Sequence, residues 1–158
     1  MMKNIAILLF ILFVGVGGLN AASFSKGAST TPVLIDQGSA TGSCSMCGML
    51  IKHFYKTSHI ATLNDGSKSQ YCSMACMSHD MSHRHYKKSS VRVVDAHTEH
   101  YIVALDAFYV MDSDVKGTMS RRSKIAFKSK KDAITFQREH GGQIVDFNTA
   151  VKAALAED

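Results

Sequence analysis

The pattern of apolar and polar positions in the first half of the chain predicts short strands around one helix. The turn signal Asn64-Asp65-Gly66 separates two strands of a hairpin, the first over residues 58–63 and the second ending near Tyr71. Residues 73–83 carry apolar side chains at helical spacing. Two further extended segments follow this helix, over residues 91–96 and 101–111.

The second half repeats this order in shortened form. Residues 124–127 are typical of a strand, Ser129-Lys130-Lys131-Asp132 resembles a capping box that starts a helix, and Gly141-Gly142 ends it. A strand over residues 143–147 and a terminal helix over residues 149–157 complete this half. Each half is too small to bury much apolar surface alone. The sequence therefore predicts an α+β fold of two small related modules, made of antiparallel strands with one helix each and packed together.

Residues 1–22 have the pattern of an export signal. Lys3 supplies the positive charge, an apolar and glycine run follows over residues 5–19, and small residues stand at Ala21-Ala22-Ser23. The run is shorter than the roughly 20 apolar residues of a membrane span. We therefore expect a cleaved signal peptide and a periplasmic protein, with no cysteine in this segment for lipid attachment.

The remaining chain divides into a leader and the two modules. Residues 23–43 are rich in Ser, Thr, Gly and Ala and show no sustained period, which predicts a flexible leader. The N-terminal module then covers residues 44–104 and the C-terminal module residues 105–158. Composition agrees with a globular protein, because 46% of the 158 residues are hydrophobic and 20% are charged. The formal net charge of +5 is mild, and the basic clusters lack interleaved aromatic residues, so nucleic-acid binding is not expected.

The four cysteines fall in two pairs, and the first pair stands among methionines. Cys44-Ser45-Met46-Cys47-Gly48-Met49 places four sulfur atoms within six residues. Thiolate and thioether sulfurs are soft donors that together favour Cu(I) over harder divalent ions. Gly48 allows the backbone to turn tightly, so that these donors can converge on one ion. The motif indicates a soft-metal site.

The second pair is Cys72 and Cys76. If a helix begins at Cys72, the two cysteines share one face with His79 and His83. The opposite face carries a methionine stripe of the kind that more often fills a core, made of Met74, Met77 and Met81. The side chains of the Cys/His face can then point toward a ligand or toward the first cysteine pair.

Other interpretations of the cysteines remain open on these residues alone. Four cysteines in an exported protein often form two structural disulfides. Two cysteine pairs can also hold a structural zinc ion, although 24 residues separate the pairs here. Cys44 and Cys47 can act as a thiol–disulfide oxidoreductase pair. The chain would then be a disulfide- or zinc-stapled binding module, or a thiol–disulfide oxidoreductase. We expect no enzyme, because the sequence shows no catalytic constellation.

Beyond the first cysteine motif, further motifs follow in a fixed order. They are Lys52-His53, Asp65-Gly66, Tyr71-Cys72-Ser73, residues 107–119, residues 127–133, Phe136 and residues 140–145. In this order they resemble the NosL family of nitrous oxide reductase accessory proteins. The resemblance covers roughly residues 44–151, and the order of the motifs is more specific than any one of them.

The resemblance implies a periplasmic Cu(I)-binding metallochaperone. Such proteins supply copper for the multicopper centre of nitrous oxide reductase and work with an ABC-type maturation complex at the membrane. The family fold has two small α+β modules, which agrees with the repeat described above. The implied copper ligands, strongest first, are Cys44, Met46 and Met119, then Cys47 and Met49, then Cys72 and Cys76. We expect a monomer or weak dimer.

The chain departs from the family in two ways. Many members are lipoproteins with a cysteine at the signal-peptide exit, and this chain has none. The second cysteine pair with its histidines is richer than the minimal family pattern. Cys72 and Cys76 can form a second copper site, join the first, or close as a disulfide, and His53 can complete a site.

Overall fold

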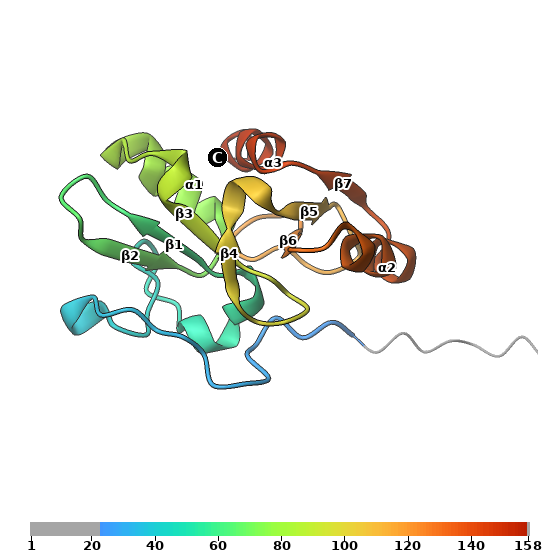
Figure 1. Cartoon of the computed structure of the whole chain (residues 1–158), viewed down its shortest axis with the longest axis horizontal. Coiled ribbons are helices and arrows are strands. Elements are labelled where there is room, and N and C mark those ends of the chain that lie inside the picture. Colours follow the sequence, from blue (N-terminus) through green and yellow to red (C-terminus); the bar gives the residue numbers. More distant parts are fainter. Residues whose placement is uncertain (1–22, 158) are drawn as a thin grey trace, which may run out of the picture.

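Figure 1 shows the computed structural model of the chain, which describes residues 23–157. The predicted export signal, residues 1–22, lies outside the described residues. Across residues 23–157, none of the helices has both the length and the apolar character needed to cross a membrane.

The first sheet has four antiparallel strands in the order β2-β1-β3-β4. Its strands are β1 (His59–Thr62), β2 (Lys68–Tyr71), β3 (Val91–Val94) and β4 (Tyr101–Val103). β1 and β2 form the predicted hairpin, in which His59 pairs with Tyr71. Helix α1 (Met74–Arg84) follows β2, and β3 then returns to pair with the other side of β1.

The second sheet has three antiparallel strands in the order β6-β5-β7. Its strands are β5 (Phe108–Met111), β6 (Lys124–Phe127) and β7 (Gln143–Val145). Helix α2 (Lys130–His140) lies between β6 and β7 in the chain. In both halves a hairpin is followed by a helix and then by a strand that pairs with the first hairpin strand. The predicted α+β fold of two related modules is confirmed.

The two halves share one hydrophobic core. Tyr71 and Met77 from the first half belong to the same buried cluster as Tyr109 and Phe147 from the second. Helix α3 (Phe147–Leu155) packs against α1, and the two lie side by side in Figure 1. A smaller cluster fills the space between the second sheet and α2. Neither half therefore completes its core without the other.

Two segments differ from the sequence prediction in detail. Residues 101–111 form two strands in different sheets, β4 and β5, separated by a 3₁₀ turn over Ala104–Asp106. This turn contains neither glycine nor proline, so the sequence lacks the usual signal of a break. The terminal helix begins at Phe147, because the Asp146 carboxylate accepts the Thr149 N–H at 2.7 Å and caps it.

Residues 23–43 contain no strand or α-helix, but hydrogen bonds attach them to the rest of the molecule. The buried Glu99 carboxylate accepts the backbone N–H groups of Ser29 and Thr30 at 3.0–3.1 Å. The Val33 N–H donates to the Tyr55 hydroxyl at 3.0 Å. The predicted leader is thus attached at several points, and its flexibility stays a prediction. Lack of periodicity does not detect such hydrogen bonds to distant side chains.

Candidate metal centre

The first cysteine motif forms a tight loop. The Gly48 N–H donates to the Cys44 carbonyl at 2.9 Å, and the Cys44 N–H donates to the Met49 carbonyl at 2.8 Å. Gly48 has a φ of 75°, a conformation that side chains rarely adopt. A further hydrogen bond, from the Ser45 N–H to the Gln70 carbonyl at 2.9 Å, attaches the loop to β2. The loop is therefore fixed beside the strand that leads to the second cysteine pair.

The second cysteine pair lies where β2 passes into α1. Ser73 is the N-cap of α1, and its hydroxyl accepts the Cys76 N–H at 3.3 Å. Cys72 thus precedes the helix, and Cys76 lies in its first turn. The positive end of the helix dipole favours a thiolate at that position.

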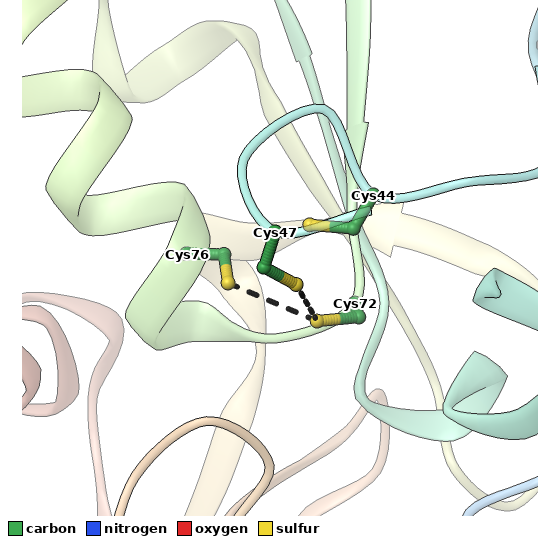
Figure 2. A group of neighbouring side chains, drawn as sticks. All are labelled: Cys44, Cys47, Cys72 and Cys76. Atoms are coloured by element: carbon green, nitrogen blue, oxygen red, sulfur yellow. Dashed lines mark hydrogen bonds between the residues drawn. The ribbon is translucent and has the colours of Figure 1, made fainter. Parts of the chain in front are cut away.

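All four thiols converge, as Figure 2 shows. Their Sγ atoms lie within 4.8 Å of one another, and Cys72 is 3.6 Å from Cys47 and 3.8 Å from Cys76. All four are free thiols, and only Cys47 is half-buried rather than buried. A tetrahedral ion with metal–sulfur bonds of about 2.3 Å places its sulfurs about 3.8 Å apart. We call this group, Cys44, Cys47, Cys72 and Cys76, the tetrathiol.

The thiols of the tetrathiol do not ionise independently. Hydrogen bonds from Cys72 and Cys76 lower the pKa of Cys44 well below its ordinary range. The same contact with Cys44 raises the pKa of Cys72, and it raises the pKa of Cys76 to about 12. Cys44 is therefore the favoured thiolate, and a bound metal must displace the protons of its neighbours.

Two of the expected methionine ligands meet the tetrathiol at a surface pocket. Met46 and Met119 line this pocket of about 160 Å³ together with Cys47, Cys76 and His79, and Ala75 completes its wall. The two methionines are 44% and 53% exposed, which is unusual for such apolar side chains. We call this space the outer pocket. Met49 is not among the residues that line it and packs against the core instead.

Met119 reaches the outer pocket from the second half of the chain. Its own φ is 52°, in the left-handed region. A Cβ on Gly117 would collide with the carbonyl oxygens of Ser120 and Arg122, so this loop requires glycine there. Close backbone packing within the loop therefore helps to hold Met119 at the pocket.

Two residues without a sequence signal support the site. Thr57 donates its hydroxyl hydrogen to the Cys72 carbonyl at 2.7 Å and lies 3.3 Å from the Thr118 hydroxyl. Lys26 donates to the carbonyls of Lys116 and Gly117 at 2.9 and 3.2 Å. Burial lowers the pKa of Lys26, while the nearby Cys72 raises it. The contacts of Lys26 with Lys116 and Gly117, and of Thr57 with Thr118, join segments more than 60 residues apart, which no local pattern reveals.

The histidines divide into one that lines the site and others that do not. His79 lines the outer pocket one helical turn after Cys76, as the predicted Cys/His face requires. His83 is exposed and stacks on His79 with ring centroids 4.5 Å apart. His53 is exposed and does not line the pocket. The methionine stripe packs in the core as expected, with Met74 and Met77 buried.

The arrangement combines a buried tetrathiol with exposed thioethers. Thiolates bind a soft ion tightly, and thioethers bind the same ion more weakly and without taking up charge. Because Cys47 and Cys76 belong to both the tetrathiol and the outer pocket, the donors form one continuous set. The site can therefore hold a soft cation close to the protein surface.

Comparisons with known proteins place the chain in a family. The profile of the NosL family matches residues 35–155, which include both cysteine pairs and Met119. The crystal structure of the copper chaperone NosL from Shewanella denitrificans is similar, with a TM-score of 0.55 and 25% sequence identity. The similarity covers 74% of this chain and 96% of that one. A search of curated proteins found no match. The family match extends over most of the chain and both of its halves, and the chain belongs to the NosL family.

Proposed function

We propose that this protein is a periplasmic metallochaperone that binds Cu(I) and delivers it for the maturation of nitrous oxide reductase. The observation that carries the proposal is the meeting of the tetrathiol with Met46 and Met119 at one pocket. A similar solved structure is described as a copper chaperone, which supports the same function.

The donor set favours Cu(I) over other soft or borderline ions. Zinc sites use cysteine, histidine and carboxylate ligands and close the coordination shell around the ion. Here two exposed thioethers border the thiols, and thioethers select Cu(I). Thioethers also resist disulfide formation, so that Met46 and Met119 stay competent ligands in an oxidising compartment. We therefore assign the ligands to the tetrathiol, Met46 and Met119, and leave out Met49.

Delivery follows from the position of the thioethers at the surface. A partner protein that brings its own sulfur or imidazole ligand can reach Cu(I) at the outer pocket and replace Met46 or Met119 first. The copper then passes to the partner by ligand exchange, without a change of oxidation state. The proposed partners are nitrous oxide reductase and its ABC-type maturation complex at the membrane. The export signal expected in residues 1–22 would bring the protein to the same compartment.

A second candidate function is that of a zinc-stapled binding module. The Sγ separations of 3.6 and 3.8 Å favour it, because they are close to those of a tetrahedral zinc site. Under this alternative the ion is a scaffold, and the exposed Met46 and Met119 have no role. Elemental analysis of the protein as purified, together with unfolding after metal removal, separates the two functions, since a scaffold protein would contain zinc and unfold cooperatively without it.

An anaerobic Cu(I) titration against a competing chelator tests the proposal. We expect Cys44→Ser to lower the Cu(I) affinity at least 100-fold, because it removes the favoured thiolate. Met46→Leu and Met119→Leu should each lower the affinity about tenfold, since each removes one thioether donor. Met49→Leu is the matched control and should leave the affinity unchanged. Equal affinities for wild type and Cys44→Ser would rule out this copper site.

A further inference from the structure

The donors of the copper site form two layers that share two residues. Cys44 and Cys72 belong to the tetrathiol alone, whereas Met46 and Met119 belong to the outer pocket alone. Cys47 and Cys76 belong to both. An ion can therefore move between the layers while it stays bound to Cys47 or Cys76. The exposure of the donors increases along this path, from the buried Cys44 and Cys72 to the half-exposed methionines.

His79 completes the outer layer with a nitrogen that the protein itself does not use. In the chain from Ser23 to Glu157, its Nδ1 is the one buried side-chain nitrogen or oxygen atom that has no hydrogen-bond partner. Leaving such an atom unpaired is unfavourable, because it has lost its hydrogen bonds to water without gaining a partner in the protein. The same side chain lines the outer pocket beside Cys76. A soft metal ion in that pocket would give Nδ1 the partner that it lacks, because imidazole nitrogen is a good ligand for copper.

The surroundings hold the His79 ring in place. His83 stacks on it at 4.5 Å, and the His83 Nδ1 lies 2.8 Å from the His79 carbonyl one helical turn earlier. His83 is itself exposed and is not among the residues that line the pocket. The two histidines thus have the same side chain and lie on the same helix, but only His79 lines the outer pocket.

We propose that the site holds Cu(I) in two adjoining positions, the tetrathiol and the outer pocket, and that His79 Nδ1 is a ligand of the outer position, from which copper leaves. This inference rests on the function proposed above and specifies how the same site releases its cargo. His79 is then the residue that converts a tight thiolate site into one that can hand copper over.

The transfer between positions is a ligand exchange that conserves charge and electrons. A bond from Cu(I) to Cys44 or Cys72 breaks while a bond to His79, Met46 or Met119 forms. A released Cys44 sulfur stays a thiolate, whereas a released Cys72 sulfur takes a proton from solvent, and copper stays in the +1 state throughout. A neutral imidazole is suited to this step, because it replaces a negative thiolate and thereby weakens the hold on the departing ion.

The rate of copper transfer from the loaded protein to a chelator tests this role. One equivalent of Cu(I) is bound anaerobically, and bicinchoninate, which turns purple on binding Cu(I), is mixed with wild type, His79→Ala and His100→Ala. We expect transfer from His79→Ala to be at least tenfold slower than from wild type, while its equilibrium affinity falls no more than the tenfold expected for Met46→Leu and Met119→Leu. His100 is exposed and does not line the outer pocket, so His100→Ala should transfer within twofold of the wild-type rate. Equal rates for wild type and His79→Ala, or equal slowing in both variants, would overturn the proposal.

Copper-edge X-ray absorption gives a second readout that does not depend on rates. In Cys44→Ser/Cys72→Ser the outer position is left with its own donors, so Cu(I) should show a nitrogen neighbour that disappears when His79→Ala is added. A spectrum without that nitrogen would overturn the role of His79. The proposed function has a separate test, because its failure would appear as unchanged Cu(I) affinity in Cys44→Ser alone.

Discussion

Met119 shows at the scale of one residue a loss of stability that fits its proposed role as a ligand. Its backbone is in the left-handed region and its side chain is 53% exposed, although methionine gains stability from burial and from an ordinary φ. A left-handed conformation at a residue other than glycine costs about 1 kcal/mol or more. Such a cost is typical of positions that serve a site.

Replacing Met119 therefore separates stability from copper binding. We expect Met119→Gly to raise the free energy of unfolding by up to about 1 kcal/mol, because glycine adopts positive φ without strain. Met119→Ala should not gain that stability, since alanine keeps the strain. Both variants should bind Cu(I) about tenfold more weakly. Urea unfolding and chelator competition measure the two effects, and a destabilised Met119→Gly would show that the backbone is not strained there.

His59 couples the stability of the molecule to pH. It is fully buried and stacks on Tyr109 of the other half, with ring planes 13° apart. Burial lowers its pKa to about 4, against an unfolded value of about 6.5. Between these values the unfolded chain binds the extra proton, so stability is present above about pH 6.5 and is lost as the pH falls toward 4. The loss attributable to this group is about 3 kcal/mol.

Unfolding measured as a function of pH checks this assignment. We expect His59→Gln to remove most of the loss of stability between pH 6.5 and 4 that wild type shows. The exposed His100→Gln is the control and should keep the wild-type pH dependence. A His59→Gln profile parallel to that of wild type would mean that other groups cause the loss.

At the scale of elements, the junction between β2 and α1 organises the site. It places Cys72 before the helix and Cys76 in its first turn, and Ser73 caps the helix between them. Thr57, in a short 3₁₀ segment before β1, bonds the Cys72 carbonyl and faces Thr118 beside Met119. One hydroxyl thus links the cysteine junction to the loop of the second half.

Removing the Thr57 hydroxyl should destabilise both the cysteine junction and the loop that carries Met119. We expect Thr57→Val to lower the free energy of unfolding by about 1–3 kcal/mol, because it leaves buried polar groups without their partner. Cu(I) affinity should fall about threefold or more, since Cys72 and the loop of Met119 lose a common anchor. Thr135→Val, at an exposed position of α2, is the matched control. If thermal unfolding and chelator competition do not distinguish the two variants, Thr57 has no positioning role.

Elements with a strong local signal could be predicted from sequence, and contacts between distant segments could not. The turn at residues 64–66, the cap at Ser129 and the period of α1 each locate an element within one or two residues. The break between β4 and β5 has no glycine or proline to mark it. The two cysteine pairs were visible as motifs, but their convergence depends on how the first loop lies against β2. The contacts of Lys26 with Lys116 and of Thr57 with Thr118 cross more than 60 residues and leave no local trace.

At the scale of the whole molecule, the two halves are joined by a core and by the metal site. The tetrathiol comes from the first half and Met119 from the second, and the larger core contains side chains of both. Copper bound across this boundary, as proposed, would add its binding free energy to the packing of the halves.

X-ray absorption at the copper edge of the wild-type protein, loaded anaerobically with one equivalent of Cu(I), tests whether the cysteine and methionine sulfurs of this site bind copper. We expect a Cu(I) spectrum dominated by sulfur neighbours, with sulfur scattering that decreases in Met119→Ala and more strongly in Cys44→Ser. A spectrum dominated by oxygen or nitrogen neighbours, or one that neither substitution changes, would contradict it.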